Sequence, residues 1–379
     1  MNTTPIPLSN PDVTRAEIDA VVAVLQTDRL SIGPRTEAFE AAVAARAGRK
    51  HGIAVNSGTS GLHLCVKALG LEPGQEVLTT PFSFVATTNC LLFERVKPVF
   101  VDIDPVSYNM DPAAMEAAVK PTTRGILPVE VFGNMAHFEA YERIAKKRGL
   151  LMLEDCCEAL GGVLSGRAAG GFGECGVFAF YPNKQITTGE GGVIVTDRDD
   201  IRDLCRSLRN QGRATDAWPS HARLGYNYRM SEITAPLGET QVKRLDEILA
   251  KRRAAAALYA DVLGDLSELH LPPMAQPASA SWFVYVVRLA DAFDQADRDA
   301  VIDALRKQGI GCSNYFVPIH TQPYIMEMLG TKAGDFPVTE RIAARTIALP
   351  FFANLSLEQA QRVREALAGA IAARARRRT

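Results

Sequence analysis

The stretch Gly176–Thr196 reads GVFAFYPNKQITTGEGGVIVT and holds two apolar runs separated by a polar turn. The run Val177–Tyr181 is long enough for a buried strand, and Val193–Thr196 has the composition of a second one. The Pro-Asn break and the glycine-rich turn between them place Lys184 on a tight loop. Such a lysine is either a solvated loop residue or a nucleophile that attacks a carbonyl carbon to form a Schiff base.

The length of 379 residues predicts two domains, or one large domain with an appendage. Apolar residues make up 47% and charged residues 22%, as in soluble globular proteins. The net charge of -1 gives no field that favours nucleic acid or an anionic membrane surface. The arginine-rich segment Arg374–Arg378 is the exception, and we interpret it as a solvated chain end.

The seven cysteines are odd in number and show no CxxC spacing. They predict reduced thiols in a cytoplasmic enzyme and no zinc motif. The first residues lack the basic and apolar regions of a signal peptide, and no apolar run reaches the roughly 18 residues of a membrane span. We therefore expect neither a membrane nor a nucleic acid as a partner.

An anion site is predicted where the strand His51–Asn56 runs into Ser57–Gly61 and then into the helix Leu62–Leu69. Free N–H groups and the positive end of the helix dipole meet at such a junction, and Thr59 and Ser60 add hydroxyl groups. The stretch lacks both GxGxxG and the P-loop lysine, so one phosphate monoester fits better than a dinucleotide or a triphosphate. The alternative is that Thr59 or Ser60 serves as a plain helix cap.

Two further candidates follow predicted strands. Phe84 comes shortly after the strand Glu76–Thr79, where α/β sheets bind ligands, although core packing would explain it as well. Asp155 follows the strand Leu150–Leu153 and is suited to a charge-assisted hydrogen bond with a protonated ring nitrogen, or to capping the next helix. The alternation of strands and helices predicts an α/β fold with a mostly parallel sheet and helices on both faces.

The second half of the chain predicts a smaller α+β domain. The expected elements are a long helix over 231–259, a strand over 282–289, a helix over 297–308, a strand over 312–317 and a final helix over 356–373. We expect an N-terminal arm at 1–14, a large domain at 15–249 and a small C-terminal domain at 250–379.

These motifs together resemble the DegT/DnrJ/EryC1/StrS family of sugar-nucleotide aminotransferases. The resemblance covers nearly the whole chain and is carried by NSGTSGLHL, PFSFVATTN, PVFVDID, EDCCEALGG, FAFYPNKQITTGEGG, LRNQG, LGYNYRMSEI and YFVPIHTQPY. It implies the fold type I, aspartate-aminotransferase-like architecture of pyridoxal phosphate (PLP) transferases, with a seven-stranded sheet.

The resemblance implies a role for each candidate around the cofactor. Lys184 would join covalently to the PLP aldehyde and act as general acid and base, and Asp155 would keep the ring nitrogen protonated. Phe84 would stack on the ring, while Thr59 and Ser60 would bind the phosphate.

Further implied roles concern the neighbouring subunit and the substrate. Asn227 would reach the phosphate bound by the other subunit of a homodimer, and His320 and Arg229 would lie near the sugar nucleotide.

Two residues depart from the family pattern. By the resemblance, Glu158 would stand beside the cofactor's 3-oxygen, where many members have Gln or His, and Ala179 would take the place of a phosphate-binding Ser.

The implied reaction moves an amino group from L-glutamate to a keto-sugar nucleotide. The TTGEGG turn and Glu158 are similar to perosamine-synthase-type enzymes, which favours a 4-keto-6-deoxyhexose nucleotide. Amination at C3 or of a cyclitol stays open. Sugar 3-dehydratases of this superfamily carry histidine in place of the lysine, so Lys184 argues against that class. A Rossmann oxidoreductase would need GxGxxG, and a binding protein without activity would be expected to have lost Lys184 or Asp155.

Overall fold

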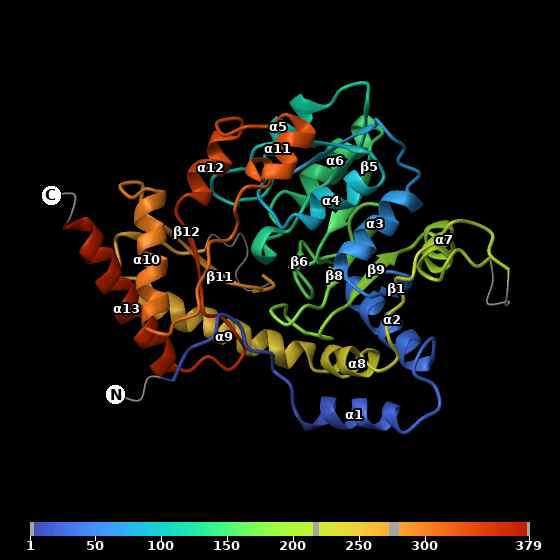
Figure 1. The fold of residues 1–379 in the computed structure, drawn as a ribbon, viewed down its shortest axis with the longest axis horizontal. Coiled ribbons are helices and arrows are strands. Elements are labelled where there is room, and N and C mark those ends of the chain that lie inside the picture. Colours follow the sequence, from blue (N-terminus) through green and yellow to red (C-terminus); the bar gives the residue numbers. More distant parts are fainter. Residues whose placement is uncertain (1–3, 215–219, 273–279, 377–379) are drawn as a thin grey trace.

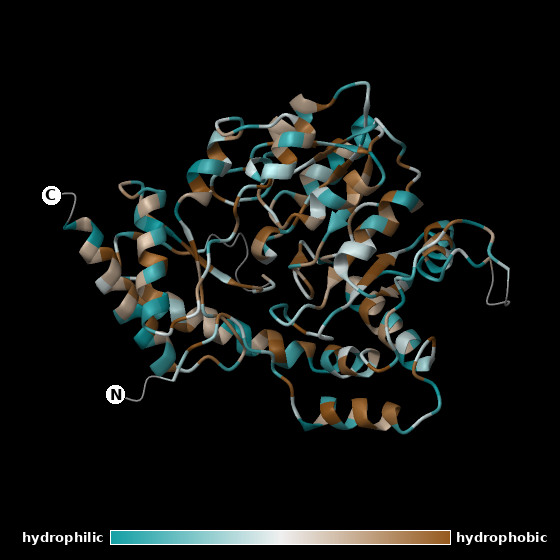
Figure 2. Cartoon of the chain, in the orientation of Figure 1, coloured by the Kyte–Doolittle hydropathy of each residue, from teal (hydrophilic) through white to brown (hydrophobic). Residues whose placement is uncertain are grey.

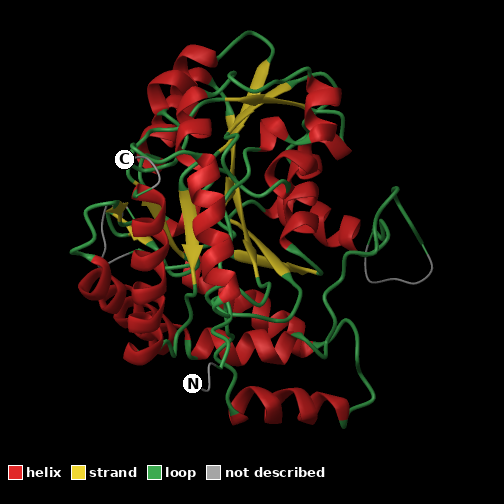
Figure 3. Ribbon diagram, turned by 60° about the vertical axis from the view of Figure 1, so that its left-hand side comes forward, coloured by secondary structure: helices red, strands yellow, loops and turns green. Residues whose placement is uncertain are grey.

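The structure is a computed structural model that describes residues 4–214, 220–272 and 280–376. Arg377 and Arg378 of the arginine-rich segment, and residues 1–3 of the expected arm, lie outside these ranges. Helices flank a central sheet on both sides (Figures 1 and 3), as the alternating pattern predicts.

The central sheet has seven strands in the order β1-β9-β8-β5-β4-β2-β3. Its strands are β1 (His51–Val55), β2 (Glu76–Thr79), β3 (Lys97–Phe100), β4 (Thr123–Leu127), β5 (Leu151–Asp155), β8 (Cys175–Ala179) and β9 (Gly192–Thr196). β9 runs antiparallel to both of its neighbours, and the other pairs are parallel. The prediction of a mostly parallel seven-stranded sheet is confirmed.

The helices of the first half cover both faces of this sheet. They are α1 (Arg15–Leu25), α2 (Pro34–Ala47), α3 (Gly58–Ala68), α4 (Ala86–Phe93), α5 (Pro112–Ala118), α6 (Phe138–Arg148) and α7 (Asp199–Arg209), with a 3-10 turn η1 (Val131–Gly133) and a small hairpin of β6 (Val163–Leu164) and β7 (Arg167–Ala168). Alternate residues of β1 point to opposite faces: Ile53 and Val55 pack in the cluster that contains α3, and Ala54 packs in the cluster that contains α2.

The second half holds a three-stranded antiparallel sheet in the order β10-β11-β12. Its elements are α8 (Ala235–Lys243), α9 (Leu245–Leu263), β10 (Leu269–His270), β11 (Tyr285–Leu289), α10 (Gln295–Lys307), η2 (Ile319–Thr321), α11 (Pro323–Leu329), α12 (Pro337–Ala343), β12 (Thr346–Leu349) and α13 (Leu357–Ala375).

Two local expectations are wrong here. The stretch 312–317 is not a strand: only Ser313 forms a bridge, to Ala348, because the residues after it turn into a cavity described below. The expected helix over 231–259 is divided at Arg244, whose backbone leaves helical geometry at φ -95° and ψ 5°.

Helix α9 connects two clusters of buried apolar residues. Its first residues, Leu245 and Ile248, belong to the cluster beneath the seven-stranded sheet, and Ala255 and Tyr259 belong to the cluster around β11 and α13. Ile6 of the N-terminal segment joins the second cluster and pairs with Ile310. The domain boundary near residue 250 stays a prediction, and α9 passes through it (Figure 1).

None of the helices in the described part of the chain combines the length and apolarity that a bilayer crossing requires. Apolar side chains are nevertheless exposed along α1, which shows brown turns at the edge of the molecule in Figure 2. Ile18, Val22 and Leu25 are 48%, 44% and 53% exposed. They form an apolar strip on the outer side of this helix.

Candidate active site

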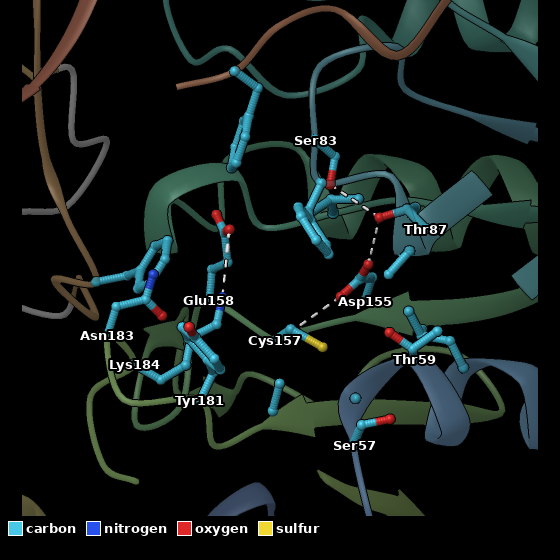
Figure 4. A pocket seen from close by; sticks show the side chains of 18 of the residues that line it. Ser57, Thr59, Ser83, Thr87, Asp155, Cys157, Glu158, Tyr181, Asn183 and Lys184 are labelled. Carbon is cyan, nitrogen blue, oxygen red and sulfur yellow. Dashed lines mark hydrogen bonds and ion pairs between the residues drawn. The ribbon is translucent and has the colours of Figure 1, made fainter. Parts of the chain in front are cut away.

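A cavity of about 540 Å³ lies where strands β5 and β8 end and helix α3 begins. This is the carboxyl edge of the parallel strands, where α/β folds bind ligands. The predicted residues Thr59, Phe84, Asp155, Glu158 and Lys184 come from four separate stretches of the sequence, and all five line this cavity. Figure 4 labels four of them: Thr59, Asp155, Glu158 and Lys184.

Asp155 ends β5 and is held by hydrogen bonds from neighbouring residues. Thr87 Oγ1 donates to Asp155 Oδ2 at 2.7 Å, and the Cys157 N–H donates to Oδ1 at 3.3 Å. The Ser83 and Thr87 hydroxyl oxygens are 2.9 Å apart, so Ser83 can donate to Thr87 while Thr87 donates to the acid. This series of hydrogen bonds fixes the Asp155 carboxylate so that it points into the cavity (Figure 4).

Lys184 lies on the loop after β8, and its amine has two close neighbours. Nζ is 3.6 Å from Glu158 Oε1 and 3.9 Å from the centre of the Phe283 ring. The Lys184 N–H donates to the Tyr181 carbonyl at 2.9 Å, which closes a tight turn. The carbonyl of Lys184 accepts a hydrogen bond from Arg252 Nη2 at 2.8 Å. Backbone and side chain of the lysine are therefore both held.

Glu158 is a buried acid beside this amine. Burial raises the pKa of Glu158, and the positive charge of Lys184 and a hydrogen bond from the Phe132 N–H at 2.8 Å only partly offset that effect. A carboxylate at this position needs a proton or a nearby cation. Lys184 is in place to supply either one, because their side chains face each other (Figure 4).

The N-terminus of α3 offers free donors to the cavity. Ser57 caps the helix by accepting from the Ser60 N–H at 3.1 Å, and the Ser60 hydroxyl donates to Asn56 Oδ1 at 2.6 Å. The N–H groups of Gly58 and Thr59 have no acceptor within the helix, because first-turn donors never do. The helix dipole adds positive potential at the same point, so this edge of the cavity suits an anion.

Gly58 is required by close packing at that edge. A Cβ there would come within 2.7 Å of the Ala179 Cβ and 3.1 Å of the Cys157 Sγ. Ala179 itself lines the cavity and has no polar side-chain atom to offer. The α3 backbone and the Thr59 hydroxyl are therefore the donors beside Ala179 that this edge offers to an anion, with the Ser57 hydroxyl also on the cavity wall.

Four predicted residues do not line the cavity. Ser60 lies behind it, with its hydroxyl bonded to Asn56. Asn227 is exposed and pairs with Asn210, and Arg229 Nη1 donates to the Asn210 side chain at 3.0 Å. His320 is fully buried, with Nε2 2.9 Å from Glu340 Oε1. Their roles stay predictions.

Sequence reasoning missed several residues that shape the cavity. Thr87 holds Asp155, and Phe283 covers the lysine amine. Tyr315 also lines the cavity, and its hydroxyl accepts from Asn183 Nδ2 at 3.3 Å. Thr87 stands inside the quoted motif PFSFVATTN, so its hydroxyl was available as a signal. Tyr315 begins the quoted motif YFVPIHTQPY, so a signal was available for it as well. Phe283 stands in none of the quoted motifs and lies about a hundred residues from Lys184, so nothing local pointed to it.

Comparisons with known proteins agree with this geometry. The sequence profile of the DegT/DnrJ/EryC1/StrS aminotransferase family matches residues 11–368. The GDP-perosamine synthase of Caulobacter vibrioides is 34% identical over 364 residues, which cover 96% of this chain and 97% of that protein.

Two solved structures are similar over almost their whole length. Helicobacter pylori PseC, an aminotransferase involved in the biosynthesis of pseudoaminic acid, has a TM-score of 0.91 at 29% identity, covering 98% of this chain and 100% of its own. The PLP form of the putative sugar aminotransferase Spr1654 from Streptococcus pneumoniae has a TM-score of 0.91 at 25% identity, covering 98% of this chain and 99% of its own.

Proposed function

The chain belongs to the DegT/DnrJ/EryC1/StrS aminotransferase family and is a PLP-dependent aminotransferase, and we propose that it moves an amino group from L-glutamate to a 4-keto-6-deoxyhexose nucleotide. The observation that carries the proposal is the meeting of Lys184 and Asp155 in one cavity with the free N-terminus of α3. The similarity to a GDP-perosamine synthase over 96% of the chain supports the choice of sugar.

The residues around the cavity fit PLP. The N–H groups of Gly58 and Thr59 would hold its phosphate, Asp155 its ring nitrogen, Phe84 its ring face and Lys184 its aldehyde. Phe84 is 61% exposed although it lines the cavity, so its ring face is free to stack on a ligand. When bound, PLP supplies an aldehyde that takes up and releases the amino group and a ring that withdraws electrons from the reacting carbon.

The protein supplies the proton transfers. We propose that the Lys184 amine removes the α-proton of L-glutamate and then, as the protonated amine, gives a proton up again. In the second half of the reaction it performs the same two steps in reverse order on the sugar. Asp155 keeps its negative charge directed at the ring, because Thr87 and Cys157 fix both of its oxygens. Glu158 lies near enough to Lys184 to hold the amine between transfers.

We also propose a homodimer with shared active sites, located in the cytoplasm. Asn227 lies outside the cavity of its own chain and is exposed, as expected of a residue that serves a partner subunit. The exposed apolar strip on α1, formed by Ile18, Val22 and Leu25, supports an interface. All seven cysteines are free thiols, which supports a reducing compartment.

The substrate assignment can be tested with a panel of keto-sugar nucleotides. The protein is incubated with PLP, L-glutamate and 4-keto or 3-keto sugar nucleotides, and aminated products are identified by mass spectrometry and NMR. Amination of 4-keto-6-deoxyhexose nucleotides at C4 is the expected result. Turnover of 3-keto substrates alone, or of none of the panel, would contradict the proposed substrate.

A further inference from the structure

Arg252 is a buried cation close to the catalytic lysine and has no part in the mechanism above. It lies in α9 and is only 3% exposed. Nη2 donates to the Lys184 carbonyl at 2.8 Å, and Nη1 is 3.2 Å from the carbonyl of Phe283 and 3.4 Å from that of Trp282. Three backbone carbonyls therefore take the place of the carboxylate that a buried guanidinium usually has.

Burying the Arg252 guanidinium without a carboxylate partner lowers the stability of the folded protein. Removing a charge from water costs several kcal/mol unless an opposite charge compensates it. Within the described residues no carboxylate forms an ion pair with Arg252, and its Nε has no acceptor. Burial lowers the pKa of Arg252 to about 10, and the negative charge of Asp12 offsets that effect only in part. An apolar side chain would fill the same space at lower cost, so packing alone does not explain the arginine.

Two of the three carbonyls that Arg252 binds belong to the lysine and to the residue whose ring covers its amine. One is Lys184 itself, and another is Phe283, whose ring centre lies 3.9 Å from the Lys184 amine. The planar guanidinium fixes these carbonyls relative to each other, because its N–H groups diverge at set angles. Arg252 thus ties together the backbones of the two residues that carry the amine and the ring.

A second tie holds the same segment independently. Gln185 Nε2 donates to the Ser281 hydroxyl at 2.7 Å and to the Glu158 carbonyl at 2.6 Å. The chain at Ser281 therefore stays attached next to the site when Arg252 is replaced. This independence predicts that substitutions of Arg252 shift the lysine without unfolding the segment.

We infer that Arg252 is a positioning residue for Lys184: through the carbonyls of Lys184 and Phe283 it sets the amine against the Phe283 ring and beside Glu158. The inference rests on the proposed role of Lys184 as the proton-transferring amine. A displacement of about 1 Å in such a group can lower the rate by about a hundredfold.

The test compares Arg252→Met and Arg252→Lys with Arg253→Met, which changes the exposed neighbour on the same helix. The first readout needs neither cofactor nor substrate: the apo-protein is treated with an amine-acylating reagent, and labelling of Lys184 is timed by peptide mass spectrometry. We expect Arg252→Met to be labelled several-fold faster, since the ring no longer covers the amine. Arg253→Met should match the wild type.

The second readout is the exchange of the amino group between L-glutamate and isotope-labelled 2-oxoglutarate after PLP is added; the oxo acid takes the amino group back from the cofactor, so turnover continues and kcat and KM are defined. We expect Arg252→Met to lower kcat by about a hundredfold with a smaller change in KM. Arg252→Lys should recover part of this loss, because an ammonium reaches some of the carbonyls but lacks the planar fork. Labelling and kcat equal to those of Arg253→Met would overturn the inference.

A variant that does not fold and a protein that does not use the proposed substrate each give a distinct result. If Arg252→Met does not fold, Arg252→Lys and Phe283→Leu carry the test: Phe283→Leu leaves the arginine in place and should also speed labelling of Lys184, and unchanged labelling would overturn the inference. If the protein aminates no sugar nucleotide but labelling changes as expected, the substrate proposal fails while the role of Arg252 stands.

Discussion

Lys184 is the one side chain on which every proton transfer proposed for this enzyme depends. We expect Lys184→Ala to keep PLP, because the contacts at the α3 N-terminus, Asp155 and Phe84 do not involve the amine. Turnover should fall by at least about 10²–10⁴-fold, the usual contribution of a general acid-base group. Cofactor content after gel filtration and the transamination rate measure the two effects. Lys332→Ala, at an exposed site, is the control, and appreciable transamination by Lys184→Ala would remove the lysine from the mechanism.

Glu130 gives a second prediction at this scale, about stability. Burial raises the pKa of Glu130 well above its ordinary value, and the charges of Glu154 and Asp155 raise it further. The folded state therefore binds a proton that the unfolded state releases. Its contribution is fully present below the ordinary carboxyl pKa and is lost as the pH rises toward the raised value, by up to about 1.4 kcal/mol per pH unit.

Glu130→Gln should remove this dependence, because the amide keeps the shape and cannot ionise. We expect the wild type to lose more unfolding free energy than the variant between about pH 5 and about pH 8, as measured by urea titration at each pH. Glu139→Gln, which alters an exposed acid on α6, should follow the wild-type curve. Parallel curves for wild type and Glu130→Gln would show that the buried acid does not titrate in this range.

The sequence allowed some of these residues to be foreseen and not others. Asp155 and Lys184 follow apolar runs that form strands of one sheet, so their meeting at its edge follows from strand order. Arg252 and Phe283 could not be found this way. They reach Lys184 from a helix and a loop beyond the sheet, and only tertiary packing brings them there.

At the scale of elements, the first turn of α3 is the most tightly constrained part of the site. We expect Gly58→Ala to lower the unfolding free energy by about 1–3 kcal/mol, because the added methyl would overlap Ala179 and Cys157. PLP should bind more weakly to the same variant, since relief of the overlap moves the N–H groups that face the cavity. Denaturant unfolding and a PLP titration of the apo-protein measure the two effects.

Gly369 supplies the matched control, because it is also a helical glycine but has no atom within 4 Å of a built Cβ. Gly369→Ala should raise the unfolding free energy by about 0.5–1 kcal/mol and leave PLP affinity unchanged. If Gly58→Ala bound PLP as tightly as Gly369→Ala does, the α3 N-terminus would not be the phosphate site.

The elements also show why the second half of the chain was harder to predict. The segment 312–317 has the apolar and aromatic composition of a strand, yet Asn314, Tyr315 and Phe316 face the cavity instead of a neighbouring strand. The strand that completes the small sheet is β12, which pairs with β11 from Arg288↔Thr346 to Tyr285↔Leu349. Composition identifies an extended segment, but the pairing partner decides whether it becomes a strand.

At the scale of the whole molecule, α9 links the site to the second apolar cluster. The helix is buried in both clusters, and it presents Arg252 to the carbonyls of Lys184 and Phe283 between them. A displacement of this helix would therefore be transmitted to the lysine through hydrogen bonds. The site depends on the packing of both clusters as well as on the residues that line it.

The proposed dimer leads to a prediction that only a shared active site satisfies. Lys184→Ala and Asn227→Ala should each be inactive or strongly impaired as homodimers. After they are mixed, unfolded and refolded together, one site of each mixed dimer combines an intact Lys184 with an intact Asn227, so activity should recover to about a quarter of the wild-type value. Sedimentation would verify the dimer, and co-refolding of Lys184→Ala with Asp155→Ala is the control, because both changes lie in the same cavity and either pairing leaves every site damaged. No recovery from the first mixture would show that Asn227 serves its own subunit or none.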